Sequence, residues 1–84
     1  MSEVIDELVS VNLLSSHLKH AVYPWALMWR GRQYRITDVG LHHTVHEGRV
    51  LMHIFSVTDG TTSFKLKLDT ETLGWRLLEI EVLN

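Results

Sequence analysis

The sequence predicts an all-β fold: one small antiparallel meander of five to six strands, forming a curled sheet or a small barrel. A length of 84 residues allows one domain. Asp59-Gly60 between two apolar runs is typical of a tight hairpin. The run Phe64–Leu68 alternates apolar and cationic residues, as expected for a strand with one solvated face. We therefore divide the domain into an N-terminal strand and loop over 1–23 and an antiparallel meander over 24–84.

The first 23 residues are compatible with two structures. Their apolar residues at near-helical spacing, which favour a short amphipathic helix, are Val4, Leu8, Val11 and Leu18. The segment 8–14 contains two β-branched valines, two weak helix formers and no capping box, which favours a strand. These residues alone leave both structures open.

The first predicted hairpin joins a strand over 25–29 to a strand beginning at Arg32, through a turn at Arg30-Gly31. Tyr34 and Ile36 are expected to pair across with Leu27 and Trp25. The second strand continues to about residue 46, and Gly40 predicts a bend or bulge within it.

Two further turns set the register of the third strand, which is expected over 49–58. If Glu47-Gly48 is a two-residue loop, His46 pairs with Arg49 and His42 lies opposite His53. If Asp59-Gly60 is also a two-residue loop, Thr58 pairs with Thr61, and Phe55 and His53 lie opposite Phe64 and Leu66. A last strand over 75–83 follows a turn-rich segment over 69–74.

The apolar residues of these strands divide between two faces. The predicted inward set is Trp25, Leu27, Trp29, Tyr34, Ile36, Leu51, Phe55, Val57, Phe64, Leu66, Leu68, Trp75 and Leu77. Val50, Met52 and Ile54 face the other way, and the last strand is apolar almost to its end. One thin sheet cannot bury both sets, so we expect either barrel closure or a partner on an unprotected C-terminal edge strand. This favours a homodimer.

The segment Pro24–Ile36 resembles the Pro-x-x-Phe-x-Trp-Arg-Gly-Arg-x-Tyr-x-Val core of a family of short bacterial proteins of unknown function. The likeness continues at Ile5-Asp6-Glu7, Val39, Phe55-Ser56-Val57, Phe64-Lys65-Leu66, Asp69 and Trp75-Arg76-Leu77. The resemblance implies an N-terminal strand, and hence six strands. It also implies a nucleic-acid or repair-adaptor role, because some relatives are encoded near DNA-repair polymerases. Leu27 replaces the usual Phe, and histidines stand where relatives often carry Trp. No catalytic residue is known for the family, so none is carried over.

The net charge, the absence of cysteine and the missing catalytic motifs argue against several classes of function. Eight Lys and Arg against ten Asp and Glu give a formal charge of −2, which provides no general attraction to nucleic acid or anionic lipid. The absence of Cys excludes disulfides and thiolate metal sites and fits a reducing, cytoplasmic location. We expect no membrane span and no signal peptide. Neither a nucleophile elbow nor a Gly-rich phosphate loop occurs, so the sequence predicts no enzyme and no cofactor.

The histidines form one candidate site. His42 and His53, if paired across two strands, are close enough to share a metal ion or a proton. Zinc needs three or four ligands, and His46 lies about 13 Å further along the strand. A hydrogen-bonded pair filling the sheet is therefore favoured over a metal site. The spacing His17-x-x-His20 brings two imidazoles together only on a helix.

The second candidate site is basic. Arg30, Arg32 and Arg35 cluster around Trp29 near the first hairpin tip, the combination that single-strand-binding proteins use for phosphates and bases. Three arginines are few, and their stems equally suit packing over aromatic rings. The sequence thus predicts a non-enzymatic protein-interaction or adaptor module that self-associates. The alternatives are single-stranded nucleic-acid binding through these arginines and metal binding by the histidine pair.

Overall fold

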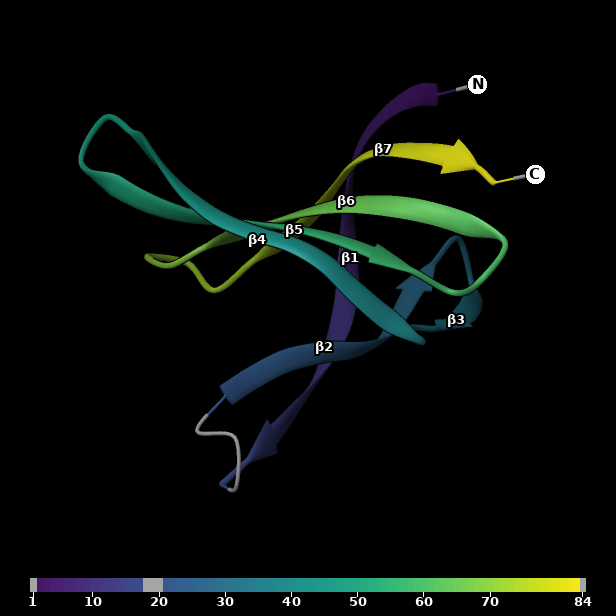
Figure 1. Cartoon of the computed structure of the whole chain (residues 1–84). Coiled ribbons are helices and arrows are strands. Elements are labelled where there is room, and N and C mark those ends of the chain that lie inside the picture. Colours follow the sequence, from purple (N-terminus) through teal and green to yellow (C-terminus); the bar gives the residue numbers. More distant parts are fainter. Residues whose placement is uncertain (1, 18–20, 84) are drawn as a thin grey trace.

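The computed structural model describes residues 2–17 and 21–83, which form one antiparallel sheet with no helix (Figure 1). Its strands follow the order β3-β2-β1-β7-β6-β5-β4 and are seven in number. Their bounds are β1 Ser2–Ser16, β2 Ala21–Trp29, β3 Arg32–Arg35, β4 Asp38–Glu47, β5 Val50–Thr58, β6 Thr62–Asp69 and β7 Trp75–Val82. The all-β class is confirmed. The sheet is curled but not closed into a barrel, because β3 and β4 remain edges.

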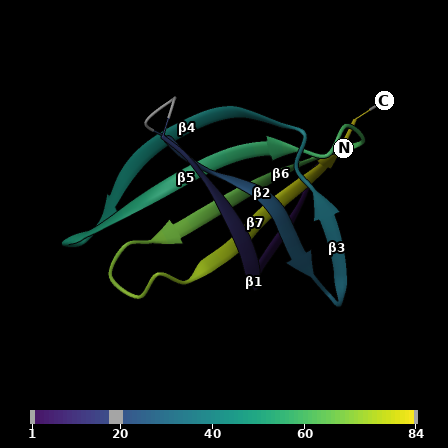
Figure 2. The same cartoon turned by 90° about the horizontal axis from the view of Figure 1, so that it is seen from below.

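The extra strand arises because the long strand expected over 32–46 is broken at Ile36 and Thr37. The Ile36 amide donates to the Trp25 carbonyl on β2, and the Thr37 amide donates to the Thr58 carbonyl on β5, each at 2.8 Å. Two residues therefore connect the opposite edges of the sheet, which holds it curled. β1 and β2 consequently cross steeply over β5, β6 and β7 (Figure 2). Gly40 lies at the register irregularity between Val39 and Leu41, where a bulge was predicted.

The N-terminal segment is a strand, and it lies between the two hairpin groups. β1 pairs with β7 through its first half and with β2 through its second half. An irregularity between Val4 and Glu7, where Asp6 has a φ of 53°, bends the strand between the two pairings. Because β1 covers one side of β7, the prediction of an unprotected C-terminal edge strand is wrong.

The core fills the concave side of the curled sheet. The buried cluster consists of Leu27, Ile36, Phe55, Val57, Phe64, Leu66, Trp75 and Leu77. Trp29, Tyr34 and Leu68 pack against it as expected. Trp25 does not belong to the core: the β1–β2 register passes from Ala26 directly to Pro24, so Trp25 is bulged and 37% exposed. Leu51 lies near the β4–β5 turn, only partly buried and outside this cluster.

The predicted pairing of Tyr34 with Leu27 across the β2–β3 hairpin is confirmed. The β4–β5 and β5–β6 registers differ from the predicted ones by two residues. At the β5–β6 turn, Thr58 pairs with Ser63, and Phe55 lies opposite Leu66. The loop is longer than expected because the Asp59 carboxylate accepts hydrogen bonds from the Thr61 and Thr62 amides, at 2.9 and 2.8 Å. A shift of two residues leaves every side chain on its predicted face, which explains why the core face is nevertheless correct.

The second apolar set is covered within the chain. Met52 and Ile54 are only 6% and 5% exposed, although they face away from the main core. Lys67 lies opposite Ile54, and its ammonium forms a 3.0 Å ion pair with Glu47 while its side chain is 20% exposed. A lysine stem held in this way shields apolar neighbours. These two residues therefore need neither barrel closure nor a partner, contrary to the expectation from sequence.

We expect Leu66→Ala to lower the free energy of unfolding by about 2–5 kcal/mol, because Leu66 is fully buried at the centre of the cluster. Leu8→Ala removes the same atoms from a β1 side chain that is 72% exposed and should change stability by no more than about 0.5 kcal/mol. Urea unfolding followed by tryptophan fluorescence measures both. Equal losses in the two variants would contradict this placement of the core.

Candidate functional site

His42 and His53 meet on the concave face, but not by direct opposition. The β4–β5 loop is Gly48-Arg49, with Gly48 at a φ of 63°, rather than the expected Glu47-Gly48. His42 therefore lies opposite Phe55, and His53 lies opposite Thr44. The two histidines are diagonal neighbours on one face, a separation that large side chains bridge. Their ring nitrogens, Nε2 of His42 and Nδ1 of His53, are 2.7 Å apart. The predicted contact is confirmed, and the predicted register is wrong.

Aromatic and aliphatic side chains surround the pair. The His42 ring stacks on Phe55, with centroids 4.2 Å apart and an interplanar angle of 2°. The His42 and His53 centroids are 5.0 Å apart. A cleft of about 190 Å³ opens beside both rings, and its other walls are Leu13, Val22, Phe55, Leu68 and Trp75. The pair is thus a polar spot in an apolar cleft. Two neutral imidazoles satisfy each other there, one donating and one accepting.

The cleft disfavours a positive charge on His42. Desolvation by the surrounding side chains lowers the pKa of His42 below its ordinary 6.5, and the imidazoles of His53 and His43 lower it further. The folded chain therefore favours the neutral form of His42 near neutral pH.

Further metal ligands are not assembled around the pair. Across residues 2–17 and 21–83, no group of three or more His, Asp or Glu side chains could hold a metal ion. His46 shares the concave face but pairs with Leu51, four residues along β4 from His42. In the other predicted spacing, His17-x-x-His20, His20 lies outside the described residues. Among the described residues, the cleft therefore offers a metal ion two imidazole ligands, those of His42 and His53.

The basic cluster at the β2–β3 hairpin is engaged with a residue that sequence analysis did not identify. The Glu7 carboxylate accepts hydrogen bonds from Trp29 Nε1 at 3.0 Å and from Arg30 Nε at 3.2 Å. The bond from Arg30, and then that from Trp29, lowers the pKa of Glu7, and the same contact raises the pKa of Arg30. Glu7 is 22 residues from Trp29, and the antiparallel pairing of β1 with β2 brings them together. No local sequence signal could reveal this contact.

Arg32 and Arg35 lie on the edge strand β3, and Arg30 lies in the turn before it. Arg30 covers the Trp29 ring at 4.7 Å, and Arg32 covers the Tyr34 ring at 5.3 Å from guanidinium carbon to centroid. Arg35 is exposed and pairs in register with Ala26. Two of the three cations are therefore stacked on rings, as the packing interpretation expects. Arg30 is in addition neutralised by Glu7.

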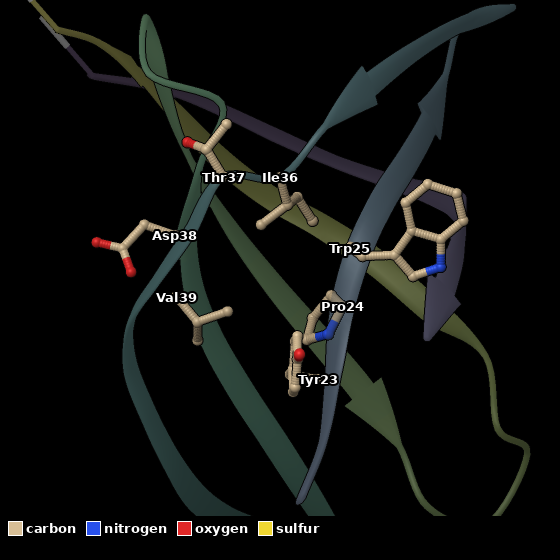
Figure 3. A pocket seen from close by; sticks show the side chains of 7 residues that line it. All are labelled: Tyr23, Pro24, Trp25, Ile36, Thr37, Asp38 and Val39. Carbon is tan, nitrogen blue, oxygen red and sulfur yellow. The ribbon is translucent and has the colours of Figure 1, made fainter. Parts of the chain in front are cut away.

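A larger cavity of about 420 Å³ lies where β2 faces the two-residue link to β4 (Figure 3). It is lined by Tyr23, Pro24, Trp25, Ile36, Thr37, Asp38 and Val39. In Figure 3 the Asp38 carboxylate and the Trp25 indole point away from each other. The polar groups of these two residues therefore do not converge within the cavity.

Comparison of the chain with protein-family models, with curated proteins and with solved structures yields no match. The family resemblance of Pro24–Ile36 therefore stays a prediction. Within the described part of the chain, no helix is long and apolar enough to cross a membrane.

We expect the free energy of unfolding to fall as the pH drops through and below about 6.5 in chelator-treated protein. The pKa of His42 is lower in the folded state than in the unfolded chain, so the unfolded chain binds more protons in this range. This contribution is present above 6.5 and is lost as the pH falls toward the lowered pKa. Urea unfolding between pH 5 and 8 (about the range in which histidine titrates) measures it.

The matched variants for this experiment are His42→Gln, which should flatten the pH dependence, and His46→Gln, which should leave it intact. A steep dependence that persists in His42→Gln would assign the effect to other groups.

Proposed function

We propose that this protein is a non-enzymatic interaction module of the cytoplasm that self-associates as a homodimer. The supporting observation is a two-stranded arm, formed by residues 13–16 of β1 and 21–24 of β2. These residues pair with each other, whereas β1 pairs with β7 only up to Val9 and β2 pairs with β3 only from Ala26. Figure 1 shows the arm projecting from the rest of the sheet.

The arm exposes large apolar side chains. Leu13, Leu14 and Val22 are 45%, 47% and 56% exposed. Leu13 and Val22 line the cleft beside the histidine pair, and Leu14, the next residue after Leu13, faces the other side of the ribbon. An isolated two-stranded ribbon is marginally stable in water, and exposed apolar patches mark interaction surfaces. A partner that covers the arm would stabilise both its strands and its apolar side chains.

The open edge of strand β4 favours a second copy of the chain as the partner. β4 is a ten-residue edge strand with no Pro or Lys, and its segment 41–46 has no formal charge at neutral pH. Such an edge is a template for strand pairing, and pairing of identical surfaces closes as a two-fold dimer. The non-enzymatic assignment is supported by the sequence, in which neither a nucleophile elbow nor a Gly-rich phosphate loop occurs.

Sedimentation at increasing protein concentration tests the proposal. Leu13→Lys and Val22→Lys should each raise the dimer dissociation constant by about tenfold or more, because a cation replaces an apolar contact. The matched control is Leu73→Lys, the same change at a leucine that is 70% exposed in the β6–β7 turn. Circular dichroism confirms that each variant is folded. A wild-type chain that stays monomeric at high concentration would overturn the proposal.

Single-stranded nucleic-acid binding is the competing function. Because Glu7 neutralises Arg30 and two arginines are stacked on rings, we expect no saturable binding of a fluorescent oligothymidylate, even at low salt. Fluorescence anisotropy at two salt concentrations measures this. Binding that weakens as salt rises and is lost in Arg32→Gln and Arg35→Gln would instead support the nucleic-acid function.

A further inference from the structure

We propose that His42 and His53 chelate one divalent transition-metal ion that prefers imidazole ligands, such as Zn²⁺, Ni²⁺ or Cu²⁺, with its open coordination positions facing the apolar cleft. This binding activity goes beyond self-association and does not depend on it. Imidazole nitrogens suit these ions, whereas Mg²⁺ and Ca²⁺ prefer oxygen ligands.

The two ligand nitrogens already converge. Nε2 of His42 and Nδ1 of His53 face each other at 2.7 Å. Two nitrogens bound to one tetrahedral ion at about 2.0–2.1 Å lie about 3.3 Å apart. A small rotation of one ring provides this opening. The ring that donates the hydrogen bond moves its proton to its other nitrogen through solvent, so both rings present lone pairs and the pair stays neutral.

Packing holds one of the rings in place before any ion arrives. Phe55 lies flat against His42 at a centroid distance of 4.2 Å, which fixes the plane of that imidazole. His53 is partly buried on β5, which pairs with both β4 and β6. Ligands on rigid strands lose little conformational entropy when they bind an ion.

The open side of the pair is the cleft of about 190 Å³ between the arm and the sheet. Its other walls, which include Leu13, Val22, Leu68 and Trp75, are apolar. The described residues supply no third His, Asp or Glu. Solvent or a small ligand in the cleft therefore completes the coordination, and the ion should exchange more readily than one with four protein ligands.

Other histidines on the same strand provide the controls. His43 lies opposite Ile54 on the convex face, and His46 lies about 13 Å along the strand from His42. Neither contributes to a site centred between His42 and His53. His17, near the arm tip, tests the separate spacing His17-x-x-His20.

Isothermal titration of the chelator-treated full chain with ZnCl₂ tests the proposal. We expect one ion per chain and a loss of about tenfold or more in affinity in His42→Gln and in His53→Gln. His17→Gln, His43→Gln and His46→Gln should bind as the wild type does. As a measurement that needs no variant, Ni²⁺ should broaden the NMR signals of His42 and His53 before those of other histidines.

Three results would overturn the proposal: no saturable binding, undiminished binding in both His42→Gln and His53→Gln, or uniform broadening of all histidine signals by Ni²⁺. Titration of Leu14→Lys, at an exposed arm residue (47%) on the side of the ribbon away from the cleft, separates this inference from self-association. A variant that is monomeric but still binds zinc would support the metal site alone, whereas a wild-type dimer without zinc binding would refute it and leave self-association standing.

Discussion

The passage from β3 to β4 through Ile36 and Thr37 is the constraint on which the rest of the structure depends. An 84-residue chain with one sheet and no helix among its described residues has no second layer to cover its apolar face. The twist of the sheet and this short link together curl the sheet onto itself. Leu27 of β2 therefore packs in one cluster with Phe55 and Phe64 of the opposite strands. The same curl creates the cleft in which the histidine pair lies and the cavity beneath the link.

The sequence predicts the features that depend on residues close together in the chain. Hairpins, strand faces and most of the core follow from turn residues and period-two alternation. The lengths of the hairpin loops could not be predicted in this way, because they depend on side-chain hydrogen bonds such as those that the Asp59 carboxylate accepts. Each register error amounts to two residues, which preserves the face and changes the opposite residue. His42 and His53 illustrate both outcomes: their shared face was predictable, and their contact is made diagonally across two strands, with Phe55 opposite His42.

The sequence does not reveal which strands pair when their residues are far apart in the chain. Nothing in residues 2–16 indicates that this segment inserts between β2 and β7, although the insertion removes the presumed C-terminal edge. It also places Glu7 against Trp29 and Arg30, which changes the chemistry of the basic cluster. Trp25 is similar: its alternation predicts an inward side chain, and a bulge against β1 turns it outward. The contacts of β1 with β7 and of Glu7 with Trp29 join residues far apart in the chain. The Trp25 bulge depends instead on the β1–β2 register, in which Leu13 lies opposite Pro24.

The position of β1 has a kinetic consequence. Its contacts with β7 join residues as far apart as Ser2 and Glu81, which pair in register. The Arg76 guanidinium also donates to the Asp6 carbonyl at 3.1 Å. The hairpins of β4 to β7 close short loops, whereas the first half of β1 pairs with a strand about 70 residues further along the chain. Because non-local pairing slows folding, we expect the hairpins to form first and β1 to dock last. Until β1 docks, β7 is an open edge, so aggregation competes with the insertion of β1 while the chain folds.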